Sequence, residues 1–398
     1  NDVAYDFRQS SNFYYLTGIN DPSTLLIAIK DGAAITITLV CKRPNELDKL
    51  WNGQVTSKSS YKKNLAIQNV IYFDELHSLK LKNVKNLYFE FKDERRLDAI
   101  LEKVNSVETK SRYHKNNDSQ STRTNLSNII YDMRRIKSSD ELSEMRYAAQ
   151  VSANAHINLI KNCRPGLSEF EIEAEFIQFC MKNQCKQAYP AIVASGKNAC
   201  TLHYTKNSST LKPNTLLLVD AAAEYNNYAS DITRTIPVSG KFTKHQKLIY
   251  ELVLKSQIMA IQACKPGKTL IDIHNVAVKQ ITKGLIKLNI LKGSIDRNIS
   301  EGKYKKYYMH NTGHWLGLDV HDPSSYVSDD NPIKLKPGMV FTVEPGIYIS
   351  NDSSLERGFH NIGVRIEDDI LITKNGCEVL SKDVPKTVKE IEKLMSYA

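Results

Sequence analysis

The chain has 398 residues, 41% of them hydrophobic and 25% charged, and a formal net charge of +10 at pH 7. It is too long for one ordinary domain of roughly 100–200 residues, and no stretch approaches the roughly 18 apolar residues of a membrane span. The lysines are dispersed, and the short basic run at 303–306 is typical of a solvated loop. The sequence therefore predicts a globular protein of two domains and excludes a membrane protein or a nucleic-acid-binding protein.

The seven cysteines are odd in number and scattered, without a CxxC pair. This spacing predicts buried free thiols in a reducing compartment rather than a disulfide framework. The first residues, Asn1 to Gln9, lack the basic and apolar regions of a secretion signal. We expect a cytoplasmic protein, or a mitochondrial or other organellar protein if an N-terminal presequence has been removed.

The first 110 residues alternate short apolar runs with charged segments that suit helices, which is an α/β pattern. The predicted strands are Thr24–Ile29, Ala34–Val40, Val70–Phe73 and Leu87–Phe91. The polar segment Lys115–Asn128 is the best candidate for a linker. We therefore predict an N-terminal domain at 1–120 and a second domain at 121–398.

Pairs of helices with the same boundary signals occur twice in the second domain. Ser138 with Glu141 has the pattern of a capping box, as does Ser168 with Glu171. The run Cys-Arg-Pro-Gly-Leu-Ser at 163–168 returns as Cys-Lys-Pro-Gly-Lys-Thr at 264–269. In both runs Pro-Gly ends one helix and Ser or Thr begins the next. An internal duplication explains the repeat, and convergence of two unrelated helix pairs is the alternative.

Two aspartates flank a predicted β-hairpin. Asp220 ends the apolar run at 215–219, and Asn-Asn at 226–227 suits a two-residue turn. That register places Asp220 opposite Thr233, with Asp231 two positions further along the same face. Two carboxylates so close would repel each other without a cation between them. The hairpin therefore predicts part of a metal site, whereas two surface aspartates would be the simpler interpretation if it stood alone.

Three histidines, His310, His314 and His321, fall in one glycine-punctuated segment. A lone histidine is more often a core residue than a ligand, but an ordinary loop seldom holds three. Gly313 and Gly317 would let backbone or ligand approach closely. The segment is therefore predicted to contribute polar groups and a metal ligand to a site.

Two strand patterns each lead to a glutamate. Val340–Val343 precedes Glu344 and a Pro-Gly turn, and a second pattern ends at Glu367. Alternation puts Arg365 on the same face as Glu367, where an arginine can support a ligand carboxylate. The candidate metal ligands are therefore four carboxylates and one imidazole: Asp220, Asp231, His314, Glu344 and Glu367. This hard, oxygen-rich set can hold two divalent cations and a bridging water. It predicts metal-assisted hydrolysis.

These segments resemble the M24 metallopeptidases of the pita-bread fold, and among them the aminopeptidase P group. The resemblance rests on Asp220-Ala-Ala-Ala-Glu-Tyr, Ser230-Asp-Ile-Thr-Arg-Thr, His314-Trp-Leu-Gly-Leu-Asp-Val-His-Asp, Val343-Glu-Pro-Gly and Arg365-Ile-Glu-Asp-Asp. The segment from Tyr5 to Gly18 is similar to the group's smaller N-terminal domain, so the likeness runs almost end to end.

Two positions depart from the resemblance. Ala222 and Asn311 stand where family members commonly carry glycine, which alters the local backbone but removes no ligand. The likeness also begins inside the N-terminal domain, so we expect that domain's first strand and helix to be missing from this chain.

The resemblance implies an α/β (α+β) chain in which a C-terminal pita-bread catalytic domain with internal pseudo-duplication follows a smaller, RNase H-like α/β domain. It implies that the five ligands hold two divalent ions, with Asp231 and Glu367 as bridges. Mn²⁺ is expected, since it suits hard oxygen ligands, with Zn²⁺ or Co²⁺ as alternatives. Glu344 would carry the water's proton towards the leaving nitrogen.

The resemblance also implies roles around the substrate. His203 and His310 would shape its pocket, and His321 would donate to the carbonyl or the developing oxyanion. Three aromatics are candidates to wall an apolar slot for proline, with an ordinary place in the core as the alternative for each: Trp315, Tyr348 and, from a neighbouring subunit, Trp51. The implied substrate is a peptide with a free amino terminus and proline in second place, and the implied assembly is a homodimer or homotetramer.

Prolidase, which uses the same five ligands but cleaves only dipeptides, is the nearest alternative function. The segment His314–Asp322 fits aminopeptidase P better, and methionine aminopeptidases lack an N-terminal domain of this kind. The alternative from another class is a catalytically inactive pita-bread domain that binds peptides or proteins. The intact ligand set argues against it.

Overall fold

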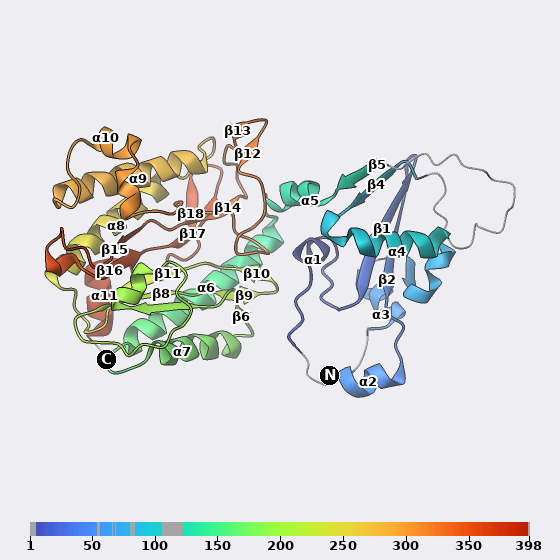
Figure 1. Ribbon diagram of the computed structural model, residues 1–398. Coiled ribbons are helices and arrows are strands. Elements are labelled where there is room, and N and C mark those ends of the chain that lie inside the picture. The colour runs from blue at the N-terminus through green and yellow to red at the C-terminus, as the bar shows by residue number, and fades with distance from the viewer. Residues whose placement is uncertain are drawn as a thin grey trace. The chain divides into compact units, whose positions relative to one another are not determined.

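The computed structural model describes residues 5–53, 56–65, 67, 69–79, 84–105 and 122–396. The chain forms two compact units, Asn1–Tyr131 and Asp132–Ala398 (Figure 1). The predicted domain boundary near residue 120 lies outside the described residues, so the division at 120 stays a prediction. Helix α5 (Ser127–Arg134) spans the junction of the two units.

A mixed three-stranded sheet forms the centre of the first unit. Strand β1 is antiparallel to β2, and β3 is parallel to β2. The predicted strands are confirmed to within two residues as β1 (Thr24–Asp31), β2 (Ala34–Cys41), β3 (Asn69–Tyr72) and β4 (Asn86–Phe89). The helices are α1 (Ser11–Thr17), α2 (Glu46–Asn52), α3 (Lys58–Leu65) and α4 (Glu94–Asn105).

The prediction that Lys115–Asn128 is a linker is wrong at its C-terminal end. Residues 122–125 form strand β5 (Thr122–Asn125), which pairs in parallel with β4, and α5 follows at once. Strand β5 reads Thr-Arg-Thr-Asn and has no apolar residue to indicate a strand. Arg123 on this strand forms ion pairs with Glu94 and Asp98 of α4. The linker's earlier residues, 115–121, lie outside the described residues.

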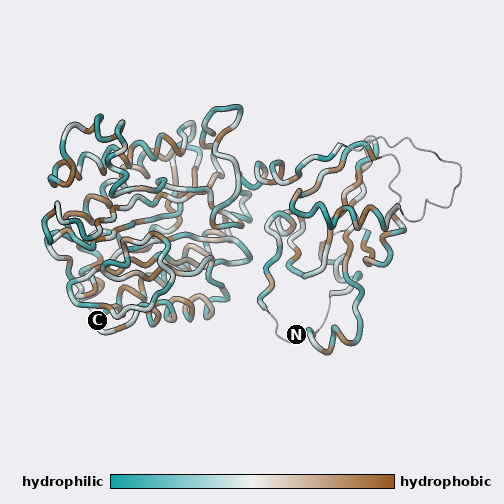
Figure 2. Tube along the Cα trace, viewed as in Figure 1, coloured by the Kyte–Doolittle hydropathy of each residue, from teal (hydrophilic) through white to brown (hydrophobic). Residues whose placement is uncertain are grey.

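The second unit packs its strands between helices. Figure 1 shows α7 on one side of the strands and α9 on the other, and in Figure 2 apolar and polar residues alternate along the helices, as expected for elements with one buried face. The α-helices are α6 (Ser139–Asn162), α7 (Glu169–Lys182), α8 (Lys244–Ala263), α9 (Leu270–Lys287), α10 (Ile295–Ser300) and α11 (Val388–Met395).

Short antiparallel sheets make up the strands of this unit. The hydrogen-bonded orders are β11-β8-β7, β14-β17-β18, β10-β9-β6, β15-β16 and β12-β13. The strands are β6 (Lys186–Gln187), β7 (Ile192–Ser195), β8 (Leu216–Asp220), β9 (Ala223–Tyr225), β10 (Tyr228–Ala229), β11 (Thr233–Pro237), β12 (Val327–Ser328), β13 (Asn331–Pro332), β14 (Val340–Val343), β15 (Gly346–Ile349), β16 (Ile362–Arg365), β17 (Asp368–Ile372) and β18 (Cys377–Val379). In the described part of the chain, the 3₁₀ helices are η1 (Phe73–Ser78), η2 (Phe91–Asp93), η3 (Gly196–Cys200), η4 (Lys303–Lys306) and η5 (Arg357–Phe359).

The predicted repeat of helix pairs is present in the structure. Ser138 and Ser168 cap α6 and α7 with complete capping boxes, and Thr269 caps α9 in the same way. Gly166 and Gly267, between the helices of each pair, both have left-handed φ angles, of 95° and 85°. The same local geometry therefore joins α6 to α7 and α8 to α9.

The repeat continues into the strands. The amide of Gly166 donates to the carbonyl of Leu211, and the amide of Gly267 donates to that of Leu335. Each leucine begins a Leu-Lys-Pro run that leads into a strand, β8 or β14. Nine residues after each leucine stands a carboxylate, Asp220 in the first half and Glu344 in the second. The two halves thus place one acidic residue each at an equivalent position.

Two further sequence expectations concern the whole chain. All seven cysteines are free thiols, and five of them are buried. Among the described residues, none of the helices has the length and apolar character that crossing a membrane would require.

Candidate metal centre

The hairpin that carries Asp220 and Asp231 has the predicted register. Asp220 lies opposite Thr233, and Tyr225 pairs with Tyr228 across the turn. The turn residues at 226–227, both asparagine, have φ angles of 47° and 65°. Asparagine tolerates this left-handed backbone, so the turn fixes the register of the whole hairpin. Both carboxylates consequently reach one face of the sheet.

Tyr189 lies between these two aspartates and was missed by the sequence reasoning. Its hydroxyl oxygen is 2.6 Å from Oδ1 of Asp220 and 2.6 Å from Oδ1 of Asp231. Desolvation, followed by the charges of the aspartates, raises the pKa of Tyr189 well above its ordinary value. The phenol therefore keeps its proton and donates it to one carboxylate at a time.

His314 is oriented by the backbone carbonyl of the next residue. Its Nδ1 donates to the carbonyl of Trp315 at 3.0 Å, which leaves Nε2 facing Asp231 Oδ2 at 3.3 Å. Gly313 is required before it, because a Cβ there would lie 1.9 Å from the carbonyl oxygen of Thr342. The predicted close backbone approach at Gly313 is confirmed, and it directs the imidazole towards the aspartates.

Asp322, directly after His321, anchors the end of the histidine segment. Its carboxylate is buried and forms ion pairs with Lys137 at 3.2 Å and with Arg134. Gly317 lies against this cluster, since a Cβ there would stand 2.6 Å from Asp322 Oδ2. The close approach predicted at Gly317 is therefore also present, and it lets the loop pack against this buried cluster.

The two glutamates complete the cluster. Ligand atoms of Asp231, His314 and Glu367 all lie within 4.8 Å of one another, so these three could hold one ion. Glu344 Oε1 lies 3.7 Å from His314 Nε2. Asp220 is linked to Asp231 by the hydroxyl of Tyr189, which contacts both carboxylates. The structure thus brings all five predicted ligands to one place, from strands and loops up to 147 residues apart in sequence, between 220 and 367.

Arg365 and Thr233 hold two of these carboxylates in place. Arg365 Nη2 donates to Asp220 Oδ2 at 2.6 Å, rather than to Glu367, which the alternation pattern had favoured. Glu367 accepts instead from Thr233 Oγ1 at 2.6 Å. Arg365 also donates to Tyr348 at 2.9 Å. The arginine therefore supports a ligand carboxylate as predicted, but the one on the hairpin.

The site concentrates negative charge. Burial raises the pKa of Glu344 to about 7, opposed by the positive charges of His314 and Arg365. Burial raises the pKa of Glu367 well above its usual range, and the charges of Asp231 and Glu344 add to that rise. Burial alone would lower the pKa of His314, but the hydrogen bond to Asp231 and the charge of Glu344 raise it to about 9. Without cations, the cluster therefore retains protons.

A cavity of about 630 Å³ opens over this cluster. It is lined by the five predicted ligands and by Leu202, His203, Leu270, Ile271, His274, His310, Asn311, Thr312, Gly313, His321, Tyr326 and Arg365. The three histidines predicted to act on substrate therefore share the cavity with the ligands. His274, a fourth, was not predicted.

Comparison with known proteins agrees with this geometry. A family model described as metallopeptidase family M24 matches residues 143–374, and one described as aminopeptidase P, N-terminal domain matches residues 1–88. The chain belongs to metallopeptidase family M24. It is 36% identical to an Xaa-Pro aminopeptidase of Escherichia coli and 39% identical to one of Haemophilus influenzae, covering all of this chain and 91% and 90% of those proteins.

A solved structure shares the fold of this M24 protein. Zn-substituted E. coli aminopeptidase P, in complex with product, has a TM-score of 0.93 and 34% identity, with all of this chain and 91% of that chain covered. The expected fold, a pita-bread catalytic domain after a smaller α/β domain, is confirmed by these matches.

The donor set of this M24 metallopeptidase fits divalent metal ions. Three buried carboxylates and the partly buried Glu344 face one another with a single arginine and one imidazole among them, so their charge is not balanced by the protein alone. Divalent cations bound by hard oxygens would balance it. Asp231, His314 and Glu367 already lie close enough together to hold one such ion.

The metal-free M24 protein should lose stability as pH rises. Glu344 has a pKa of about 7 in the folded state, against about 4.3 for an ordinary glutamate, so its contribution is present below pH ~4 and is lost towards pH 7. Saturating Mn²⁺ should raise the melting temperature by roughly 5–10 °C at pH 7.5 and by clearly less at pH 5, because the ions displace those protons. Thermal unfolding with Mn²⁺ and with EDTA measures this, and an equal rise at both pH values would contradict it.

The pocket walls differ from the prediction. Trp315 is 1% exposed and Tyr348 is 3% exposed, and neither is among the residues that line the cavity. Trp315 donates to the carbonyl of Ser325 and stacks on Tyr326, and it is Tyr326 that faces the cavity. The large rings are buried because burial stabilises them more than exposure at a cavity wall.

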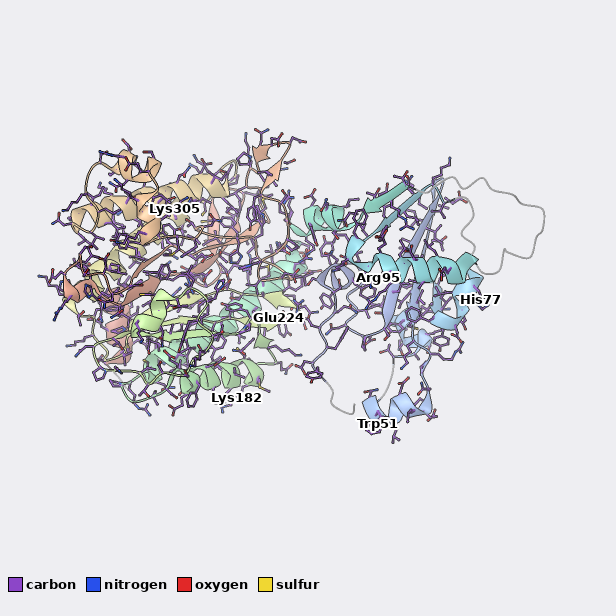
Figure 3. The ribbon with its side chains drawn as sticks, in the orientation of Figure 1. Trp51, His77, Arg95, Lys182, Glu224 and Lys305 are labelled. Atoms are coloured by element: carbon purple, nitrogen blue, oxygen red, sulfur yellow. The ribbon has the colours of Figure 1, made fainter. Side chains whose placement is uncertain are left out.

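Trp51, the third predicted wall residue, belongs to the first unit. It lies on α2 with its side chain 65% exposed (Figure 3). Its role as a wall contributed by a neighbouring subunit stays a prediction.

A buried glutamate positions the loop that carries His203. Glu169, the first residue of α7, is fully buried. Its two oxygens accept five hydrogen bonds from Ser195, Asn198, Tyr204 and Ser209. Sequence reasoning did not identify Glu169, because its partners are 26 to 40 residues away.

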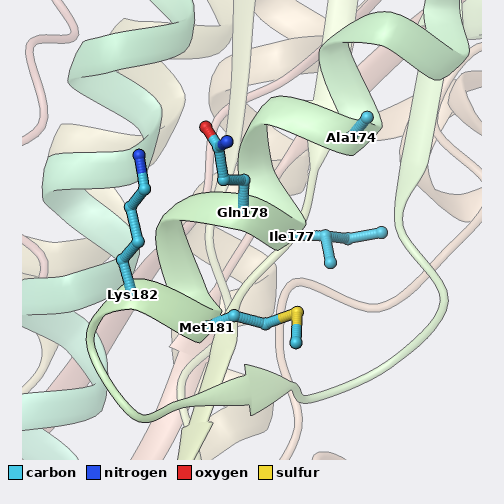
Figure 4. A pocket seen from close by; sticks show the side chains of 5 residues that line it. All are labelled: Ala174, Ile177, Gln178, Met181 and Lys182. Atoms are coloured by element: carbon cyan, nitrogen blue, oxygen red, sulfur yellow. The ribbon is translucent and has the colours of Figure 1, made fainter.

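A second hollow lies on the outer face of α7 (Figure 4). It is lined by Ala174, Ile177, Gln178, Met181 and Lys182. These side chains offer no carboxylate or imidazole, so this hollow cannot support the chemistry of an M24 metallopeptidase.

Behind the ligands, a buried ion pair ties the two halves together. Arg234, 1% exposed on β11, donates to Asp368 Oδ1 at 2.7 Å and to the carbonyl of Glu367 at 2.5 Å. Asp368 also accepts from Gln257 and Lys386. Because Arg234 binds the backbone of a ligand residue, this pair helps to set the position of Glu367.

Proposed function

We propose that this protein is an Xaa-Pro aminopeptidase, which hydrolyses the bond between an N-terminal residue and a following proline. The observation that carries the proposal is the alignment of Xaa-Pro aminopeptidases with the whole chain, over both units. The ligand cluster beside a cavity lined by several histidines supports a hydrolytic function at that place. The substrate is a peptide with a free amino terminus.

We propose that Asp220, Asp231, His314, Glu344 and Glu367 would hold two divalent ions. Bound there, the ions would lower the pKa of a shared water and offset charge on the oxyanion. The Zn-substituted E. coli relative supports a divalent metal. Mn²⁺ is our choice because four of the five donors are hard carboxylates.

The side chains around the ligands perform the remaining steps. Glu344 takes the proton of the attacking water and delivers it to the proline nitrogen, which must gain a proton to leave. His321 faces the cavity 4.2 Å, ring to ring, from His314, and donates to the developing oxyanion. His310 is fixed by a 2.9 Å hydrogen bond to Tyr348, and burial lowers its pKa to about 3, so it acts as a neutral ring.

We also propose a homodimer or homotetramer in the cytoplasm. The exposed indole of Trp51 supports an interface in which it is covered. Size-exclusion chromatography with light scattering tests the assembly, and a monomer at all concentrations would contradict it.

The function is tested with the purified protein, Mn²⁺ and three peptides: Xaa-Pro-Xaa, the dipeptide Xaa-Pro, and Xaa-Ala-Xaa as the control. Release of the first residue from Xaa-Pro-Xaa alone is the expected result. Cleavage confined to the dipeptide would make the protein a prolidase. Cleavage of none of them, with metal bound, would favour an inactive peptide-binding domain.

A further inference from the structure

His274 lines the cavity but has no part in the proposed mechanism. It lies in the first turns of α9, near Leu270 and Ile271, which line the cavity with it. Its Nδ1 is 2.9 Å from Thr312 Oγ1, and Thr312 in turn is 2.5 Å from the hydroxyl of Tyr308. The ring is therefore held in a fixed orientation at the cavity wall.

The direction of these hydrogen bonds determines which nitrogen carries the proton. Tyr308 is fully buried, and among the described residues Thr312 is the one hydrogen-bond partner of its hydroxyl. Tyr308 must donate to Thr312, since its proton would otherwise be buried unpaired. Thr312 then donates to Nδ1 of His274, and the proton of the neutral imidazole is on Nε2. Burial lowers the pKa of His274, with the charge of Lys305 contributing, so the ring is neutral at pH 7.

Nε2 of His274 has no partner among the described residues, although the ring lines a cavity. By contrast, a hydrogen-bond partner is present for Nδ1 of His274 and for both ring nitrogens of His310. A donor that is fixed in place and unpaired at a cavity wall is suited to a ligand's acceptor oxygen.

The ring of Tyr308 packs against both His274 and His310. His310 Nδ1 is 3.7 Å from Glu344 Oε2, and its ring is 5.0 Å from that of Tyr308. The centre of the Tyr308 ring is also 6.0 Å from the centre of the His274 ring. Ile271, one turn before His274, is 52% exposed, so this wall extends to the mouth of the cavity.

An aminopeptidase cleaves after the first residue, so one residue lies on the amino side of the cleaved bond and the rest of the peptide must leave through the mouth. We propose that His274 determines specificity on the carboxyl side: its Nε2 donates to the carbonyl or carboxylate oxygen of the residue after proline, while Leu270 and Ile271 contact that residue's side chain. This inference rests on the proposed function.

Two substitutions of His274 distinguish a contact of Nε2 with substrate from a role of the ring in supporting Thr312. In His274→Asn the amide lies where Nδ1 was and can keep the bond to Thr312, but nothing replaces Nε2. In His274→Gln the amide reaches the place of Nε2. The substrates are Xaa-Pro-Xaa and Xaa-Pro-amide, which share the cleaved bond but differ in the residue after proline. His245→Asn is the matched control, because His245 pairs with Glu356 away from the cavity.

With Xaa-Pro-Xaa, His274→Asn should raise KM about tenfold with little change in kcat, the loss expected for one hydrogen bond. With Xaa-Pro-amide it should change neither, and His274→Gln should restore KM for the longer substrate to within about threefold. Equal losses with both substrates, no loss with either, or a glutamine variant no better than asparagine would overturn the inference alone. A wild-type protein that cleaves neither substrate would overturn the proposed function and this inference with it.

Discussion

Replacing Asp231 by asparagine is expected to reduce hydrolysis of an Xaa-Pro-Xaa peptide by at least about 10³-fold, equivalent to roughly 4 kcal/mol of transition-state stabilisation. Asn keeps the shape of the side chain but removes a negative charge and a ligand oxygen from the group that includes His314 and Glu367. Glu367→Gln should have the same effect for the same reason. Steady-state kinetics with saturating Mn²⁺, together with metal content by mass spectrometry, measures the loss.

Both variants should stay folded. Each substitution keeps the shape of the side chain and removes a carboxyl group from a cluster whose members repel one another when charged, so the metal-free protein should melt no earlier than the wild type at pH 7.5. Asp296→Asn, at an exposed position on α10, is the control and should keep full activity. Full activity of Asp231→Asn or Glu367→Gln would exclude the two-metal site.

Replacing Arg234 by methionine should lower the free energy of unfolding by about 3–5 kcal/mol. The side chain is 1% exposed, and its loss leaves the fully buried carboxylate of Asp368 with Lys386 as its remaining cationic partner. The carbonyl of Glu367 loses its donor in the same step. Urea denaturation of the metal-free proteins measures the change.

The control for this prediction is Arg146→Met. Arg146 makes a similar pair with Glu378, at 2.8 Å, but the two side chains are 44% and 37% exposed. Exposed pairs contribute about 0–1 kcal/mol, so Arg146→Met should be nearly neutral. A similar loss of unfolding free energy in both variants would show that the buried pair of Arg234 stabilises the fold no more than an exposed pair does.

Local signals in the sequence were sufficient for the helix starts and for the hairpin. Ser138 and Ser168 each have their capping partner three residues later, and the asparagines at 226–227 fix the register by their own backbone preference. The five ligands were identifiable because each ends a strand or stands in a loop whose neighbours carry the pattern. Such information lies within a few residues of the position it specifies.

The features that were missed depend on distant partners. Tyr189 is 31 and 42 residues from the aspartates it bridges, and His274 is 38 residues from Thr312. Neither has a local pattern that distinguishes it from an ordinary core residue. Strand β5 was missed for a related reason, since its pairing with β4, rather than any apolar alternation, makes it a strand.

The separation of the ligands along the chain also determines when the protein can acquire its metal. Asp220 and Asp231 belong to one half of the duplicated unit, whereas His314, Glu344 and Glu367 are supplied by the other. During synthesis the complete set is present only once Glu367 has been added to the chain, and the ligands meet only after both halves have folded together. We therefore expect these proposed ligands to bind metal once the two halves have come together, so that the supply of ions around the folded protein decides which one it carries.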